Sequence, residues 1–593
     1  MLRAQRLTRR LVCDDRHRDR LRRAETQAWS ARRPELARLE VKGALEQTGA
    51  HLLLGERLVW PRVPHQKRWQ DHVPIEEPFD RPLKLKGSST RVGRLVNPGG
   101  ARVSPKIEAD FVGSVANAAT VVALAHPGQK RLAFTDSRRS AEELGKALLG
   151  QGVCAFVTHG SLSLTERKEA EQMFARGEDC VIVATSVLEL GVDVGDLDRV
   201  IQLDAPSSVA SFLQRMGRTG RRDGATPNCT FLCTKDSTLV QALAVVSLSQ
   251  RGWVESVDPP RAAAHVFAHQ VMALAIEREG VRLPEVEQAL KGAAAFAELH
   301  GDARRAIAEH MLQTGILADY DGRLWLGPKG EKRYGRANFR ELYAVFDAPR
   351  LLKVMHHATE IGTVDAYFIA LLLERPSPER AGLGAFVLGA RPWQLQHVDW
   401  TRGLCTVVPA DDARAPRWAG GPRFLSRVLC QEIRAVLLSE DEPVPLTARA
   451  RRALATERAL HAFLKETDVE APVVEAAAEV SWWTFAGGAA NLLLARMLAK
   501  ELGEKVFSTN FRVTFREGAA SSIVRVRDAI ETLRAAGRPS DEDALGFASE
   551  ASKTRLSKFE PCLPPAKLHA LQARTLFDLP AARAALSASC SPG

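Results

Sequence analysis

Several features are missing from this 593-residue chain, and each absence narrows the class of protein. No uninterrupted apolar run approaches the roughly 20 residues that a membrane-spanning helix requires. The basic start is not followed by the apolar core of a signal peptide. The nine cysteines are scattered and odd in number, which is unlike a secreted disulfide scaffold and indicates a reducing compartment. We therefore expect a cytoplasmic protein with no membrane partner.

The cysteines also give little support for a metal site. Cys229 and Cys233 are the closest pair, but no second ligand pair accompanies them, and both fall on a segment that reads as a buried strand. Because a structural zinc ion usually takes four protein ligands, we interpret these cysteines as core packing and predict no metal site.

Length and charge set broader limits. A chain of this length is too long for one hydrophobic core, so three or four globular units are expected in addition to the N-terminal segment. The formal net charge of +11 and the pI near 9.3 suit a polyanionic partner. Net charge indicates which partners a protein associates with, but it does not determine the fold.

Apolar runs alternate with amphipathic stretches between residues 130 and 233, which is typical of a parallel sheet covered by helices. The helix after the first strand carries Ala141, Leu144 and Leu148 on one face, and Ser140 with Glu143 fits a capping box at its start. Other helices are expected at 164–174 and 209–216. The predicted strands are 132–135, 155–157, 181–184, 200–203 and 230–232.

Polar clusters follow these strands, where an open parallel sheet places its ligand crevice. They occupy residues 135–139, 159–161, 185–186 and 191–193. Downstream, Q-R-M-G-R-T-G-R-R places Arg215, Arg218 and Arg221 three residues apart, and we expect them to share a face. Guanidinium groups match phosphate oxygens bidentately, so this row suits a polyphosphate. The alternative, a solvated basic face, fits poorly with Gly217 and Gly220, which weaken a helix and allow close backbone approach.

In this order and spacing, the segments resemble the second RecA-like lobe of a superfamily-two helicase over residues 105 to 250. Three motifs resemble those of the Lhr (large helicase-related) family, namely T-H-G-S-L-S, A-T-S-V-L-E-L-G-V-D-V-G-D-L-D and S-F-L-Q-R-M-G-R-T-G-R-R. Y-A-V-F at 343–346, E-I-G-T at 360–363 and G-A-R-P-W at 389–393 extend the resemblance from about Asn97 to the end of the chain.

The resemblance implies ATP-dependent translocation along a single nucleic-acid strand, with DNA favoured over RNA. Arg218 and Arg221 would be arginine fingers that stabilise charge on the transferred γ-phosphoryl group. Gln214, Gly191 and Asp193 would lie at the ATP-binding seam between two lobes. A helix cap is the alternative role for Ser186. The residues implied to contact nucleic acid are Ser137, Arg138, Gly160, Thr185, Ser186 and Trp393.

We do not find the other half of such an ATPase site in the sequence. Neither a G-x-x-x-x-G-K-[ST] loop nor an acidic box is found, and Pro127-Gly128-Gln129-Lys130 lacks both the spacing and the hydroxyl. We therefore expect ATP and Mg²⁺ to be used only with a complementary first RecA-like lobe, which could be separately encoded. One hypothesis is that the chain is the distal part of an Lhr-like helicase. The alternative is an orphan nucleic-acid-binding protein without motor activity.

The predicted fold class is multidomain α/β and α+β. Residues 1–96 are Arg-rich, and they could be disordered, a basic arm or a stretch translated out of its ancestral frame; we favour the last interpretation. A RecA-like lobe is expected at 97–252 and a winged-helix domain at 253–348, with a hairpin turn at Asp321-Gly322. A β-rich module at 349–437 and a mixed, mainly helical domain at 438–593 would follow. Trp393, Trp400 and Trp418 lie near arginines in the β-rich module, and we expect at most one of them to stack on a base, the others filling the core.

Overall fold

The protein is described here from a computed structural model. The described residues are 53–54, 57–58, 104–189, 197–220, 225–257, 259–335, 351–374, 384–411, 413, 416, 424–466, 469–476, 479–516, 522–550 and 556–588. The chain divides into two compact units, Met1–Arg102 and Val103–Gly593. In the first unit β1 (Leu53–Leu54) and β2 (Arg57–Leu58) form a short antiparallel pair. Among the described residues, no helix has the length and apolar character needed to cross a membrane.

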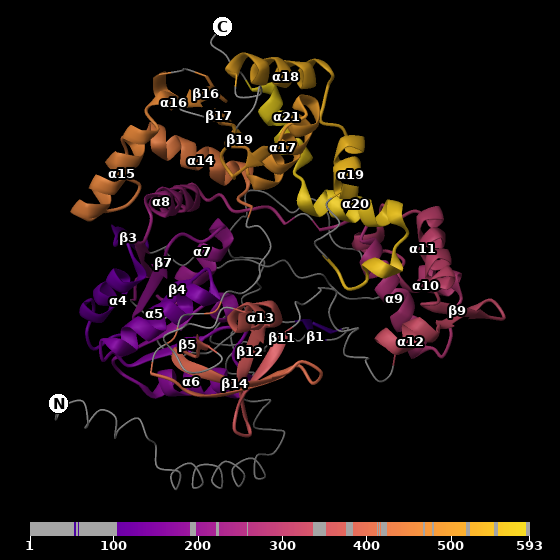
Figure 1. The fold of residues 1–593 in the computed structure, drawn as a ribbon, viewed down its shortest axis with the longest axis horizontal. Helices are drawn as coiled ribbons and strands as arrows, with labels where there is room; N and C mark the ends of the chain where they lie inside the picture. Colours follow the sequence, from indigo (N-terminus) through magenta and orange to yellow (C-terminus); the bar gives the residue numbers. More distant parts are fainter. Residues whose placement is uncertain are drawn as a thin grey trace, which may run out of the picture. The chain divides into compact units, whose positions relative to one another are not determined.

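A six-stranded parallel sheet forms the first part of the second unit (Figure 1). The strand order is β3-β8-β7-β4-β6-β5, and the central strands are almost fully buried because helices cover both faces. The five predicted strands are confirmed. The edge strand β3 was missed, although its sequence, K-I-E-A-D-F, has the alternation of polar and apolar residues typical of a half-buried edge strand. The strands are β3 (Lys106–Phe111), β4 (Lys130–Thr135), β5 (Ala155–Thr158), β6 (Cys180–Ala184), β7 (Arg199–Leu203) and β8 (Asn228–Cys233).

The helices of this lobe begin at serine caps in several cases. Ser137 has extended backbone and its Oγ accepts a hydrogen bond from the Ser140 backbone N–H at 2.9 Å. The prediction that Ser140 begins this helix was therefore wrong, because Ser140 already lies inside the first turn. The helices are α4 (Val115–Leu124), α5 (Arg138–Gly150), α6 (Leu164–Arg176), α7 (Val209–Met216) and α8 (Asp236–Gln250), with a short 3-10 turn, η2 (Ser186–Leu188).

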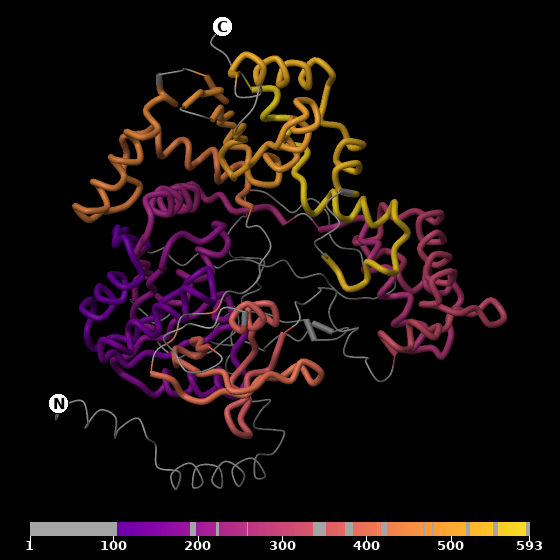
Figure 2. The backbone as a smooth tube through the Cα atoms, viewed as in Figure 1, coloured from indigo at the N-terminus to yellow at the C-terminus, as the bar shows by residue number. Residues whose placement is uncertain are grey.

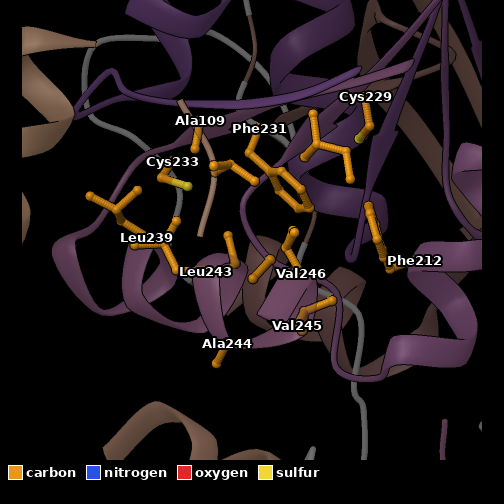
Figure 3. Close-up of a cluster of buried hydrophobic side chains, with 14 of the residues drawn as sticks. Ala109, Phe212, Cys229, Phe231, Cys233, Leu239, Leu243, Ala244, Val245 and Val246 are labelled. Carbon is orange, nitrogen blue, oxygen red and sulfur yellow. The ribbon is translucent and has the colours of Figure 1, made fainter. Parts of the chain in front are cut away.

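The core beneath α8 is drawn in Figure 3. The rings of Phe212 on α7 and Phe231 on β8 lie 5.5 Å apart between centroids, and Leu239 and Leu243 of α8 are also buried in this cluster. Cys229 and Cys233 are buried in the same cluster, which confirms their role in packing. Burial raises the pKa of Cys229 to about 12 and that of Cys233 well above its usual value.

A helical domain with a hairpin follows the lobe. Asp321 and Gly322 both adopt positive φ between β9 and β10, so the predicted two-residue turn is confirmed. Two arginines of this domain bond to backbone carbonyls: Arg304 Nη2 donates to the Phe296 carbonyl at 3.1 Å, and Arg333 Nη2 donates to the Lys558 carbonyl at 3.4 Å. The elements are α9 (Ala264–Glu277), α10 (Leu283–Ala289), η3 (Ala294–Phe296), α11 (Gly301–Gln313), β9 (Leu317–Tyr320), β10 (Arg323–Leu326) and α12 (Pro328–Tyr334).

A five-stranded sheet of order β12-β11-β15-β14-β13 forms the predicted β-rich module. The helix α14 (Arg427–Leu438), which the sequence placed in this module, packs instead against α8 of the lobe. Its apolar face, which includes Leu429, Ile433 and Val436, joins the lobe core. The elements are β11 (Leu351–His356), β12 (Thr359–Asp365), α13 (Ala366–Glu374), β13 (Ala385–Leu388), β14 (Arg391–Asp399) and β15 (Leu404–Pro409).

The remaining chain is mainly helical, as predicted, around a four-stranded antiparallel sheet of order β16-β17-β19-β18. Figure 2 traces it in orange and yellow. The elements are α15 (Ala448–Leu460), α16 (Phe463–Glu466), β16 (Val473–Ala476), β17 (Glu479–Trp482), α17 (Gly488–Leu502), β18 (Val506–Ser508), β19 (Val513–Arg516), α18 (Ile523–Ala535), α19 (Asp541–Glu550), η6 (Glu560–Cys562), α20 (Pro565–Leu576) and α21 (Leu579–Ser587).

Candidate functional site

A cleft of about 580 Å³ opens at the carboxyl ends of β4 and β6, beside α7. This is the edge at which an open parallel sheet places its ligands. Most side chains that line it carry a hydroxyl, an amide or a charge. They are Thr135, Asp136, Thr185, Ser186, Glu189, Ser207, Ser208, Ala210, Ser211, Gln214, Arg215 and Phe424.

Three of the predicted site residues meet in this cleft, namely Thr185, Ser186 and Gln214. Ser186 and Gln214 are exposed and Thr185 is half-buried. The cap position of the short turn η2 belongs to Thr185, which makes no side-chain capping bond, so the alternative of Ser186 as the helix cap does not hold. The hydroxyls of Thr185 and Ser186 therefore line the cleft without serving as helix caps.

Two further predicted residues follow the neighbouring strand β4. Ser137 Oγ is engaged as the cap of α5, and its carbonyl accepts a hydrogen bond from Thr135 Oγ1 at 2.9 Å. Arg138 is half-buried in the first turn of the same helix, and burial lowers its pKa. Because β4 and β6 pair directly in the sheet, the segment with Ser137 and Arg138 and the segment with Thr185 and Ser186 leave the sheet at the same edge.

The arginine segment divides into two environments. Arg215 is only 4% exposed, and its Nη1 donates to Asp136 Oδ1 at 2.6 Å and to Gln202 Oε1 at 2.8 Å. Its Nε donates to Glu189 Oε1 at 2.8 Å. The guanidinium also lies over the ring of Phe134, 5.3 Å from the centroid. Arg215 is therefore committed to the wall of the cleft.

Arg218 lies beyond the end of α7, because Gly217 is the C-cap of that helix. The predicted face shared by Arg215, Arg218 and Arg221 is therefore not the face of one helix, because α7 ends before Arg218. Arg218 is half-buried, and its Nη2 donates to the backbone carbonyl of Glu189. Glu189 thus contacts both arginines, Arg215 through its carboxylate and Arg218 through its carbonyl. The predicted residues Arg221, Gly191 and Asp193 lie outside the described residues.

The end of β5 is closed by the β-rich module. Glu142, on α5, is fully buried, and its carboxylate accepts hydrogen bonds from the backbone N–H groups of Gly389 at 2.7 Å and Ala390 at 2.5 Å. His159 Nε2 lies 2.8 Å from Glu142 Oε1, and the Ser161 N–H donates to His159 Nδ1 at 3.3 Å. Nδ1 is therefore the acceptor, and Nε2 carries the proton that is donated to Glu142.

The backbone after His159 also pairs with the module. The Ser161 carbonyl accepts a hydrogen bond from the Thr363 N–H at 2.7 Å, and the Ser163 N–H donates to the Ile361 carbonyl at 3.0 Å. Gly160, the predicted contact in this loop, is exposed, and a Cβ built on it would meet no atom within 4 Å.

Trp393 lies in the core of the β-rich module and not on its surface. It is 3% exposed, and its indole N–H donates to the Leu388 carbonyl at 2.9 Å. His356 and Arg391 lie against the ring, at 5.1 Å and 5.5 Å. Trp393, which the resemblance implied as a nucleic-acid contact, is one of the tryptophans that fill the core, because packing covers its ring.

Sequence reasoning missed Asp136, Glu142 and Glu189, the carboxylates that hold these motifs. Glu142 had a detectable signal, because it adjoins Ala141 on the apolar face of a helix where a lone carboxylate needs partners. Asp136 and Glu189 stand inside or beside the polar clusters, but no local pattern indicates their partner Arg215, which is 79 and 26 residues away in the chain.

Comparison with known proteins agrees with this geometry. The family described as helicase conserved C-terminal domain matches residues 115–223. The chain is 31% identical over 281 residues to the Lhr helicase/uracil glycosylase of Escherichia coli, which covers 44% of this chain and 17% of that protein. It is 32% identical over 148 residues to the ATP-dependent helicase Lhr-Core of Methanocaldococcus jannaschii, covering 25% and 18%. The chain therefore contains a helicase conserved C-terminal domain at residues 115–223, and its sequence is similar to Lhr helicases.

The fold of this chain is also similar to a solved structure. That structure is Mycobacterium smegmatis helicase Lhr bound to ssDNA and AMP-PNP, with a TM-score of 0.56 and 20% identity over 84% of this chain and 69% of that one. The sequence matches to the two relatives span less than a fifth of their lengths.

Proposed function

We propose that this chain is the distal part of an Lhr-type ATP-dependent DNA helicase or translocase. The observation that carries the proposal is the cleft at the ends of β4 and β6. Glu189 at this cleft holds Arg218 by its carbonyl, one turn away from the exposed hydroxyl of Ser186. Residues suited to a nucleotide and residues suited to a strand backbone are therefore joined by a single short segment.

Arg218 is the proposed arginine finger. A fixed guanidinium stabilises negative charge that develops on a transferred phosphoryl group, and such a finger contributes on the order of a thousandfold or more in rate. Arg221 is the second proposed finger, and Gln214, Gly191 and Asp193 are proposed at the seam with a first lobe. ATP with Mg²⁺ supplies the phosphoryl group for hydrolysis when the complementary lobe is present. Among the described side chains, no group of three or more His, Cys, Asp and Glu residues could hold a metal ion.

Thr185, Ser186, Ser137, Arg138 and Gly160 are the proposed contacts to one nucleic-acid strand. Hydroxyl, guanidinium and backbone donors position phosphates without reading the base sequence. Binding of this kind weakens as salt rises, because cations are released when phosphates are neutralised. The positive net charge of the chain supports the same interpretation.

The test is reconstitution of ATP hydrolysis. The full chain is mixed with a purified first RecA-like lobe that carries a phosphate loop, and hydrolysis is measured with and without single-stranded DNA. We expect DNA-stimulated turnover that Arg218→Ala lowers by roughly a thousandfold. The matched control is Arg139→Ala, which removes an exposed arginine on α5 of the same lobe and leaves turnover unchanged.

Equal turnover with and without Arg218 would contradict the finger assignment. If the mixture hydrolyses no ATP but the chain binds a single strand with salt-dependent affinity that ATP does not alter, the alternative holds, and the chain is a nucleic-acid-binding protein without motor activity.

A further inference from the structure

A second cleft, of about 680 Å³, lies between the segment that enters α9 and the helix α20. It shares no lining residue with the cleft in the α/β lobe. Its volume lies within the range of about 300–1,000 Å³ typical of small-molecule sites, and such sites favour the contact between two domains.

The charged lining is mainly cationic. Arg261, Lys567 and Arg574 line the cleft together with one carboxylate, Glu298, so three positive charges face one negative charge. Arg574 Nη2 lies 3.6 Å from Glu298 Oε2. Over the ranges that the structure covers, no hydrogen bond or ion pair engages the side chain of Arg261 or Lys567. An excess of about two positive charges therefore remains for an anionic ligand.

Two further features of α9 lie at the same cleft. Ala263 is the N-cap of this 14-residue helix, and Ala263 and Ala264 line the cleft, so the positive end of the helix dipole lies beside it. His265 also lines the cleft, and its Nδ1 is buried with no hydrogen-bond partner among the residues described. Burial lowers the pKa of His265, so the ring is neutral near pH 7 and offers one donor or acceptor.

Apart from Thr575, the rest of the lining is apolar. Leu299 is 2% exposed, Leu571 is half-buried, and Pro259 and Pro260 also line the cleft. A bare inorganic phosphate would leave most of this apolar volume unfilled. The lining therefore suits an anion that carries an organic body.

We propose that this cleft is a binding site for an organic phosphate, with the phosphate on Arg261, Lys567 and Arg574 and the organic body against Leu299 and Leu571. A free nucleotide-sized molecule and the phosphorylated end of a nucleic-acid strand share this chemistry. The site is independent of the proposed ATP hydrolysis, because none of its residues belongs to the α/β lobe.

Isothermal titration calorimetry with adenosine 5′-monophosphate (AMP) as the probe tests the site on the full chain. We expect saturable binding that the double variant Lys567→Gln/Arg574→Gln weakens by about a hundredfold, because each charge-assisted hydrogen bond contributes about tenfold. Glu298→Gln should strengthen binding several-fold, because it removes the competing carboxylate. The matched control is Arg305→Gln, which removes the same charge from an exposed position on α11 and leaves AMP affinity unchanged.

A competition experiment distinguishes a free organic phosphate from the phosphorylated end of a nucleic-acid strand as the natural ligand. If a 5′-phosphorylated oligonucleotide displaces AMP and its 5′-hydroxyl counterpart does not, the natural ligand is a strand end, and if neither displaces AMP, it is a free organic phosphate. The proposal is overturned if the wild-type chain shows no saturable AMP binding. It is equally overturned if the double variant binds AMP as the wild type does, or if Arg218→Ala abolishes binding and so places AMP at the lobe.

Discussion

The strands β5 and β6 lie side by side in the sheet, and each ends in a run of polar residues. After β6, Thr185 and Ser186 line a cleft. After β5, His159 is 0% and Ser161 2% exposed, because the β-rich module covers them. Two motifs that look alike in the sequence therefore have different surroundings in the fold.

The difference comes from partners that are distant in the sequence. The closed end has Glu142, a buried carboxylate that bonds both His159 and the turn at Gly389 and Ala390. The open end has Glu189, which takes up Arg215 as part of the wall and leaves the hydroxyl groups next to it accessible. A polar residue after a strand is thus available to a ligand only where no other domain supplies its partner.

The largest expected effect concerns the wall of the open end. Arg215→Ala leaves the carboxylates of Asp136 and Glu189 without their shared cation, and removing one member of a buried ion pair costs about 3–5 kcal/mol. We expect a loss of that size in the free energy of unfolding, measured by urea denaturation. Arg139→Ala should change it by less than about 0.5 kcal/mol, as for most surface positions; equal effects of the two variants would show that Arg215 is not structural.

At the closed end, Glu142→Ala removes the acceptor of three donors and should destabilise the protein by about 3 kcal/mol. Among the described residues, the adjacent Glu143 is paired only with Arg139 across one turn of α5, so Glu143→Ala serves as the control, with an expected change below about 0.5 kcal/mol. Denaturation followed by tryptophan fluorescence would report both. A Glu142→Ala protein as stable as the wild type would show that the Glu142 carboxylate does not hold the segment after β5 against the β-rich module.

A smaller effect is expected on strand binding. Thr185→Val combined with Ser186→Ala should weaken affinity for a single-stranded oligonucleotide by roughly tenfold, because a neutral hydrogen bond contributes about 0.5–1.5 kcal/mol. Ser161→Ala is the matched change at the closed end, where the buried Oγ has no partner within the described part of the chain, and it should leave affinity unchanged. Fluorescence anisotropy measures both. Equal losses would erase the distinction between the two strand ends.

The smallest effect concerns the far edge of the sheet, where 445–447 cover β3 and Asp110 meets Arg449 and Thr447. Burial raises the pKa of Asp110, but the hydrogen bonds from Arg449 and Thr447 outweigh burial and hold the pKa below its usual value. A lowered carboxyl pKa stabilises the fold above the unfolded-state pKa, and this contribution is lost as pH falls below about 4. We expect the wild-type protein to lose less than about 1 kcal/mol of unfolding free energy from this pair between pH 5 and pH 3. The Asp110→Asn variant should lose less over the same range in urea denaturation, and an identical pH profile for the two proteins would contradict a stabilising role of the Asp110 carboxylate.

The sequence predicted the α/β lobe well because its strands are continuous apolar runs and its helices are amphipathic. It also predicted the Asp321-Gly322 turn, since these residues adopt positive φ readily. It missed the edge strand β3, although the alternation of polar and apolar residues there is a local signal for a strand. It did not predict the packing of α14 on α8 or the burial of Trp393, because both depend on partners that local periodicity does not identify.

The central claim is that the end of β6 is open to a nucleic-acid strand and the end of β5 is covered. Hydrogen–deuterium exchange with and without a saturating single-stranded oligonucleotide tests it most directly, because the method reports on both strand ends in one protein. We expect new protection at the amides of Ser186 and Val187, which have no acceptor among the described residues, and no change at the amides of Leu162 and Ser163, which already donate to the His159 and Ile361 carbonyls. Protection confined to 161–163, with none at the amides of Ser186 and Val187, would contradict the central claim.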